Sequence, residues 1–186
     1  MDGEIEQRVV GMAVRAGFPV PKVVRAQSDE DGRYVVLMPR SSDGVLMYVT
    51  PEGAALPGEV LDLVFLQEYV MAQLGLRQHR AVLPVIVGVP IVAMGIVLNF
   101  LVGAMVAIVV TVVAIPVVWS GYEAVWNRRF MRRVDRRLAE LMGAEGFRTA
   151  LGQLAGSREW ERGFGWLYLG APPLPPERLR WVQNAG

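Results

Sequence analysis

The sequence predicts an α+β cytoplasmic domain that is interrupted by a two-helix transmembrane hairpin. Residues 81–119 contain no charged side chain, whereas the segments on both sides are too polar to span a membrane. The chain has 186 residues, of which 53% are hydrophobic, so it can form one small soluble domain plus the hairpin but not two full domains. The predicted division is 1–80 for the N-terminal part of the domain, 81–119 for the hairpin and 120–186 for a C-terminal helical part.

The N-terminal part should contain a helix and a small sheet. Four apolar residues lie on one face of the helix, which Gly17 is placed to end. Residues 23–26 form a candidate strand. Residues 34–38 and 45–50 are apolar and β-branched, and the Asp43-Gly44 pair between them is a turn signal, so this region predicts a β-hairpin. The apolar helix residues are Ile5, Val9, Met12 and Ala16.

Helices are expected on both sides of the apolar segment. Pro57 is placed at the start of a long helix that should reach about Arg80. After the apolar segment, residues 122–142 have a helical pattern that Gly143 stops. Shorter helices are expected over 145–154 and 176–183.

The apolar segment 81–119 is too long for one membrane span. A single helix of this length would measure roughly 58 Å, about twice the ~30 Å hydrocarbon core of a bilayer. Asn99 to Gly103 offers a break, which predicts one helix over 82–98 and a second over 104–119. The alternative is a hairpin buried inside a soluble protein, but so small a domain could hardly cover both helices.

Basic residues flank the apolar segment on both sides. Under the positive-inside rule they predict two spans in the plasma (inner) membrane, with both termini in the cytoplasm and the turn at the opposite face. Aromatic residues would form an interfacial belt, and anionic membrane lipid is a sufficient partner for the arginines. The basic residues are Arg77, Arg80, Arg128, Arg129, Arg132 and Arg133, and the aromatic ones are Trp119, Tyr122 and Trp126.

Composition argues against several functions. The net charge of +1 gives no reason to expect a nucleic-acid partner. The chain has no cysteine, which rules out disulfides and thiolate metal sites, and His79 is its only histidine, so the usual zinc ligands cannot be assembled. There is no glycine-rich phosphate loop and no convincing nucleophile arrangement. We therefore predict no metal and no cofactor.

Five segments around the helical hairpin carry a family resemblance. They are Val10 to Val23, Leu63 to Met71, Met131 to Ala139, Gly143 to Leu154, and Leu174 to Trp181, with Ala171-Pro172-Pro173 as an alternative register for the last. In this order they resemble the HtpX-like membrane metallopeptidases, a zinc enzyme family that includes prenyl-protein processing proteases. Gln67-Glu68-Tyr69-Val70-Met71 stands where that family has H-E-x-x-H. Met131 to Asp135 fits its E-x-x-A-D pattern with the aspartate kept.

The resemblance implies a metallopeptidase-like domain with a degenerate site. The family's zinc ligands correspond to Gln67, Met71 and Met131, and an amide with two thioethers cannot replace two imidazoles and a carboxylate around Zn²⁺. The two methionines should fill the cavity. Without a metal-bound water, Glu68 has nothing to activate. We therefore expect a pseudopeptidase that acts by protein binding, as an accessory subunit of a membrane complex or a regulator. The alternatives are an active peptidase with an unorthodox site and a lipid-binding or structural membrane protein.

Two surfaces are candidates for binding another membrane protein. Peptidases of this type hold the substrate as an added strand at a sheet edge, which needs no metal. The candidate edge here is Tyr34 to Met38, with Val36 at its centre. The other surface lies within the membrane, where small residues permit close helix approach. These are Gly88, Ala93, Gly95, Gly103, Ala104 and Ala107.

Overall fold

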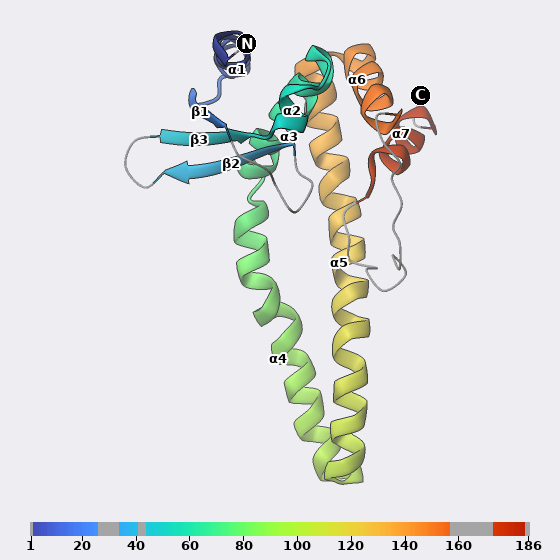
Figure 1. Ribbon diagram of the computed structural model, residues 1–186. Helices are drawn as coiled ribbons and strands as arrows, with labels where there is room; N and C mark the ends of the chain where they lie inside the picture. Colours follow the sequence, from blue (N-terminus) through green and yellow to red (C-terminus); the bar gives the residue numbers. More distant parts are fainter. Residues whose placement is uncertain (1, 26–33, 41–43, 157–172, 185–186) are drawn as a thin grey trace. The chain divides into compact units, whose positions relative to one another are not determined.

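The computed structural model describes residues 2–25, 34–40, 44–156 and 173–184 (Figure 1). The chain divides into two compact units. The globular unit comprises Met1–Leu74, Val134–Trp160 and Leu174–Gly186. The hairpin unit comprises Gly75–Arg133 and Glu161–Pro173. The described residues are mostly helical and include one small mixed sheet, which agrees with the predicted α+β class.

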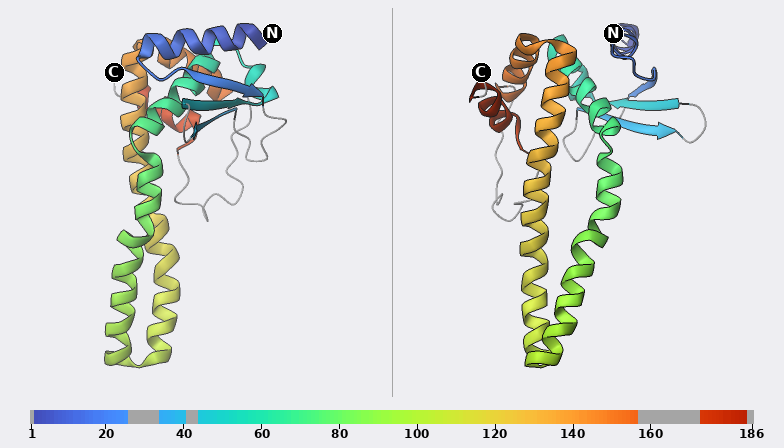
Figure 2. Two further views of the ribbon diagram at one scale, coloured as in Figure 1. Left: turned by 90° about the vertical axis from the view of Figure 1, so that its left-hand side faces the viewer. Right: turned by 180° about the vertical axis from the view of Figure 1, so that it is seen from behind.

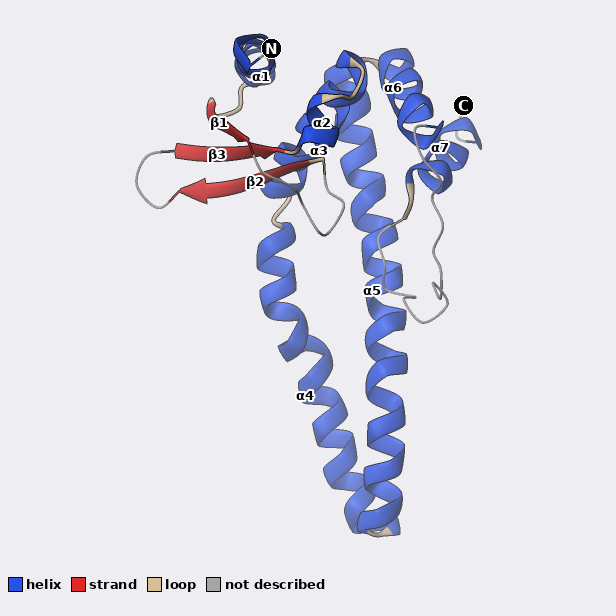
Figure 3. Ribbon diagram, in the orientation of Figure 1, coloured by secondary structure: helices blue, strands red, loops and turns tan. Residues whose placement is uncertain are grey.

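Three strands form the sheet of the globular unit (Figure 3). They are β1 (Pro21–Arg25), β2 (Val35–Arg40) and β3 (Gly44–Val49), in the order β1-β3-β2. β2 and β3 are antiparallel, which confirms the predicted β-hairpin. β1 pairs in parallel with the other side of β3 and begins two residues earlier than predicted. Within the described sheet, β2 is therefore an edge strand, as expected.

The two faces of the sheet differ in burial. The register places two cross-strand pairs on one face, where all four side chains are buried: Val35 with Val49 and Leu37 with Met47. The opposite face carries two pairs whose side chains are half-buried or exposed: Val36 with Tyr48 and Met38 with Leu46. The second face is thus apolar in composition without being part of the core.

Helices pack around the buried face and complete the core. α3 contacts β2 and α6, α1 contacts β1, and α6 contacts α7. The bounds are α1 (Asp2–Ala16), α2 (Pro51–Ala54), α3 (Gly58–Gln73), α6 (Ala144–Gly156) and α7 (Pro175–Asn184). Residues from Val134 onward in α5 (Ala104–Met142) also belong to the globular unit. The largest fully buried side chains include Met47, Leu63, Phe65, Leu138, Phe147 and Leu151.

Glycines mark the ends of several helices, and one of them corrects a prediction. Gly17 follows α1 and Gly143 separates α5 from α6, both as expected. Gly75, however, has a φ of 76° and lies between α3 and α4, so the predicted continuous helix from Pro57 to Arg80 is wrong. A left-handed residue interrupts the helical backbone, and any side chain there would cost roughly 1–2 kcal/mol.

The hairpin unit is built from α4 (Leu76–Val102) and the first part of α5, which meet at Gly103 (Figure 2). The turn is shorter than predicted, because Asn99 lies inside α4 and Gly103 alone, with a φ of 89°, separates the helices. α5 is also one continuous helix through Gly121 instead of the two predicted segments. Both helices are long and apolar enough to cross a membrane, by length and composition.

Side-chain burial in the hairpin unit is sparse. Val87 and Ile91 of α4 are buried and pack with Trp119 and Tyr122 of α5. Gly95 faces α5 closely, because a Cβ atom added to it would lie 2.8 Å from Thr111 Oγ1. We call this line of contacts the hairpin seam. Most other apolar side chains of the two helices are exposed, which is unlike the core of a soluble protein.

Candidate functional site

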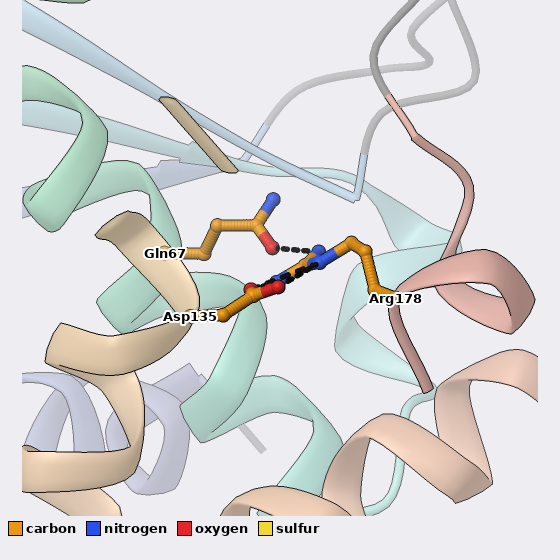
Figure 4. A network of polar contacts seen from close by, with 3 residues as sticks. All are labelled: Gln67, Asp135 and Arg178. Carbon is orange, nitrogen blue, oxygen red and sulfur yellow. Dashed lines mark hydrogen bonds and ion pairs between the residues drawn. The ribbon is translucent and has the colours of Figure 1, made fainter. Parts of the chain in front are cut away.

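Three polar side chains from distant parts of the chain meet inside the globular unit (Figure 4). Gln67 comes from α3, Asp135 from α5 and Arg178 from α7. Arg178 Nε donates hydrogen bonds to Asp135 Oδ1 at 3.0 Å and to Oδ2 at 3.3 Å, and Nη2 donates another to Oδ1. Arg178 Nη1 donates to Gln67 Oε1 at 2.5 Å. The guanidinium thus joins three helices, and we call this group the arginine cluster.

The arginine cluster is almost fully removed from solvent. Arg178 is 2% exposed and Asp135 is 7% exposed. Transferring two such charges out of water costs several kcal/mol for each ion, so they are stable inside only when they are paired and hydrogen-bonded. The forked contact with the carboxylate and the added bond to the amide provide that compensation. The geometry therefore fixes all three side chains in one arrangement.

Helical periodicity explains why Asp135 points inward. Three other residues of α5 near Asp135 are buried: Met131 and Val134, four and one residues before it, and Leu138, three residues after it. These four positions make one face of the helix, so the aspartate stands in an otherwise apolar stripe. An acidic residue in that position predicts a buried cationic partner.

α7 presents Arg178 in the same way. Pro175 and Arg178 are buried, and Leu179 and Val182 are half-buried on the same stripe. The helix start is well defined, because the backbone N–H of Leu174 donates to Glu177 Oε2 at 3.2 Å and Pro175 occupies the first helical position. This capping interaction places Arg178 in the first turn of α7.

The structure locates the residues that the sequence assigned to a degenerate site. It brings Gln67 and Asp135 together, and it does so through Arg178, which the sequence did not single out. Glu68 and Met71 follow on α3 and are half-buried. Met131 is buried one turn before Asp135. It belongs to the hairpin unit, so its approach to Gln67 and Met71 stays a prediction.

The arginine cluster does not fit a metal ion. Among the described residues, no three His, Cys, Asp or Glu side chains are grouped so that they could hold one. The acceptor oxygens of Asp135 and Gln67 are directed at the guanidinium of Arg178. A divalent cation at the same oxygens would meet a fixed positive charge in a medium of low dielectric constant, which is strongly unfavourable. The cluster's own cation is therefore the arginine.

A second contact anchors the segment between α1 and β1 to α3. The hydroxyl of Tyr69 donates a hydrogen bond to the carbonyl oxygen of Pro19 at 2.5 Å. Its ring stacks on Phe18 with centroids 4.8 Å apart and tilts against Phe65 at 5.0 Å. Burial raises the pKa of Tyr69 from 10.0 to about 12. These contacts favour a structural role for Tyr69.

The predicted peptide-binding edge is more restricted than the sequence suggested. The backbone N–H of Thr50 donates to the carbonyl oxygen of Tyr34 at 3.1 Å. Because hydrogen-bonded pairs alternate along an antiparallel ladder, the backbone N–H and C=O groups of Val36 and Met38 also point toward β3. The outward backbone groups of β2 then belong to Val35, Leu37 and Pro39. Because Pro39 has no N–H, it weakens this edge as a template for an added strand.

The small residues of the helical hairpin fall into two groups. Gly95 lies in the hairpin seam against Thr111, and Ala107 is buried. A Cβ atom added to Gly88 would instead meet no atom within 4 Å. Gly95 therefore serves the packing of the hairpin on itself, whereas Gly88 faces open space that another helix could occupy.

A scan against protein-family models finds no matching family, and comparisons with curated proteins and with solved structures find no match. The resemblance to HtpX-like peptidases therefore rests on the residues of this chain alone.

Proposed function

We propose that the chain is a catalytically inactive, membrane-anchored homologue of the HtpX-like peptidases. It acts by binding another membrane protein, as an accessory subunit of a complex or as a regulator. The arginine cluster carries this proposal, because it joins segments 63–71, 131–139 and 174–181, each of which carries the resemblance. Gln67 and Arg178 are 111 residues apart in the sequence. The three segments meet at one buried point, as the parts of a single site should.

The chemistry of the arginine cluster favours an inactive protein. Arg178 compensates the charge of Asp135 and also donates a hydrogen bond to the amide oxygen of Gln67. Without a bound metal there is no activated water for Glu68 to deprotonate. We expect purified protein to contain zinc far below stoichiometric amounts and to cleave no casein-type substrate. Stoichiometric zinc with peptidase activity would favour the alternative of an enzyme with an unorthodox site.

The exposed apolar surface of the hairpin unit supports membrane insertion. In water, a continuous apolar surface of this extent would cause association, whereas a bilayer covers it on all sides. The basic residues in the first turns of α4 and after the apolar part of α5 favour two spans of the plasma (inner) membrane with both termini in the cytoplasm. Reporter fusions after Gly58 and Gly186 should both indicate a cytoplasmic location. Opposite locations would contradict the two-span topology.

The structure offers a partner two distinct surfaces. One is the apolar second face of the sheet, where Met38 is 47% exposed beside half-buried Val36 and Leu46. The other is α4 at Gly88, where a Cβ atom would meet no atom within 4 Å and a second helix could approach closely. The two surfaces lie in different units, so substitutions can test them separately.

Co-purification from native membranes in a mild detergent tests the proposal. Wild-type protein should retain a stoichiometric protein partner, and either Met38→Glu or Gly88→Leu should lose it while keeping the wild-type melting temperature. Gly95→Leu is the matched control for Gly88→Leu, because it disturbs the contact with Thr111 in the hairpin seam and leaves the open position at Gly88 unchanged. Absence of any stoichiometric protein would contradict the proposal and favour a lipid-binding or structural role.

A further inference from the structure

The turn between α4 and α5 exposes large apolar side chains. Phe100, Met105 and Leu101 are 81%, 79% and 73% exposed, the highest values among the large hydrophobic residues that the structure describes as exposed. Residues 100–110 contain no polar side chain, and Gly103 alone separates the two helices. Turns that lie in water are normally rich in polar residues. This turn has the composition of a lipid contact.

The length of α5 places the turn at a defined depth in the membrane if Trp119, Tyr122 and Trp126 of α5 mark the cytoplasmic interface. Between Tyr122 and Gly103 the helix rises about 28 Å, which is close to the ~30 Å thickness of a hydrocarbon core. Along α4, the rise from Arg80 to the turn is about 34 Å. The helices are therefore just long enough to reach the far boundary, with no residues left to extend beyond it.

The backbone of the turn prevents it from stopping inside the hydrocarbon. The last carbonyls of α4 and the first N–H groups of α5 have no partners within their own helices, and the amide of Asn99 lies one turn before Gly103. Such groups cost several kcal/mol each in lipid without hydrogen bonds. Moving Phe100, Leu101 and Met105 fully into water would also be unfavourable, by about 1.5–3 kcal/mol for each. Only the boundary between headgroups and acyl chains satisfies both requirements.

We propose that the Gly103 turn is seated in this boundary of the far leaflet, where lipid is its binding partner, and that the helical hairpin presents no segment to the aqueous phase beyond. This inference rests on the proposed membrane insertion and specifies how deeply the turn is inserted. It also directs the protein partner of the hairpin to the membrane interior and the cytoplasmic side, because the described residues of α4 and α5 offer no surface beyond the far boundary.

Single cysteines test the depth, since the natural chain has none. Ala104→Cys and Met105→Cys replace exposed residues, so folding should be preserved. In intact cells, a charged impermeant maleimide should label them at least about tenfold more slowly than an uncharged permeant one, because the charged reagent is excluded from the apolar side of the boundary. The positive control is the same chain with Gly-Ser-Cys-Ser-Gly inserted after Gly103, which should react rapidly from outside.

The outcomes separate this inference from the proposed membrane insertion. Labelling of Ala104→Cys from outside at the rate of the control would place the turn in water and overturn the inference, while leaving the two-span topology intact. Labelling by the impermeant reagent only in inside-out vesicles would overturn both. A fluorophore on Met105→Cys gives an independent measurement: nitroxide lipids should quench it most when the nitroxide is near the headgroup, and quenching only by mid-chain nitroxides would overturn the inference.

Discussion

The two units differ in where their charged side chains and their apolar surface lie. The globular unit encloses an apolar core and buries an ion pair, Asp135 with Arg178, inside it. Where burial along α4 is described, by contrast, the buried side chains are Val87 and Ile91, and most of the others are apolar and exposed. The first unit supplies its own low-dielectric interior, whereas the second depends on its surroundings for one.

This difference determines where substitutions should have large effects. Removing one charge from the globular unit leaves the other charge buried and unpaired. In the hairpin unit most side chains face the surrounding medium, so only the seam residues can alter the packing of the unit itself. Three predictions test this contrast, beginning with the largest expected effect.

Asp135→Ala should destabilise the protein by about 3–5 kcal/mol, because the guanidinium of Arg178 would remain buried without its counter-ion. Chemical denaturation in detergent, followed by circular dichroism, measures the loss. The double variant Asp135→Leu with Arg178→Met removes both charges and should recover most of it, since apolar residues of similar size often replace a buried ion pair without net cost.

Arg137→Ala is the control on the same helix. Its partner Glu140 lies 2.7 Å away, and both side chains are about half exposed, so the loss should be only about 0–1 kcal/mol. If Asp135→Ala were as mild as Arg137→Ala, the buried arginine cluster would not be a main support of the globular unit.

Gly95→Leu should open the hairpin seam, because even a Cβ atom at this position meets Thr111 Oγ1 at 2.8 Å. Overpacking of this kind costs about 1–3 kcal/mol. Hydrogen–deuterium exchange in α4 should accelerate, while exchange in α3 and α6 stays at the wild-type rate. A Cβ atom at Gly88 meets no atom within 4 Å, so Gly88→Leu should leave the exchange rates of α4, α3 and α6 unchanged. Equal effects of the two leucines would show that the seam does not hold the helices together.

Local signals in the sequence predicted much of the fold. The β-hairpin of β2 and β3 and the stops at Gly17 and Gly143 were recognised because short-range backbone chemistry decides them, although Asp43 of the predicted turn lies outside the described residues. Gly75 was overlooked because Leu74 and Leu76 continue the apolar pattern on both sides of it. The continuity of α5 was missed because the change from apolar to polar residues after Trp119 was interpreted as a boundary, although backbone hydrogen bonding does not depend on side-chain polarity.

The arginine cluster was only half predictable. Gln67 and Asp135 were found through the family resemblance, but the prolines before Arg178 obscure the periodicity of a helix of ten residues. A usable signal was nevertheless present. Asp135 and Arg178 each stand on an apolar helix face, and two opposite charges in such positions predict a buried pair. The hydrogen bond between Thr50 and Tyr34 decides which backbone groups of β2 point away from β3, and this register could not be predicted from composition.

Tyr69→Phe should destabilise the protein by about 0.5–1.5 kcal/mol, less than Asp135→Ala, because it removes one hydrogen bond to Pro19 and keeps the ring contacts with Phe18 and Phe65. The hydroxyl also gives a pH dependence. Its pKa is raised to about 12, so the neutral form is favoured in the folded state. That contribution is complete below the unfolded pKa of 10.0 and is lost as the pH rises toward 12.

Denaturation of wild type and Tyr69→Phe at a series of alkaline pH values measures this contribution. The difference in stability between the two should be constant up to about pH 10 and should shrink between pH 10 and 12, as ionisation of Tyr69 in the unfolded state removes the advantage of the neutral hydroxyl. Tyr48→Phe on the half-buried face of the sheet is the control for general alkaline effects on tyrosines. A difference that stays constant to pH 12 would mean that the pKa of Tyr69 is the same in the folded and unfolded states, and the hydroxyl would then not be shielded from water by the fold.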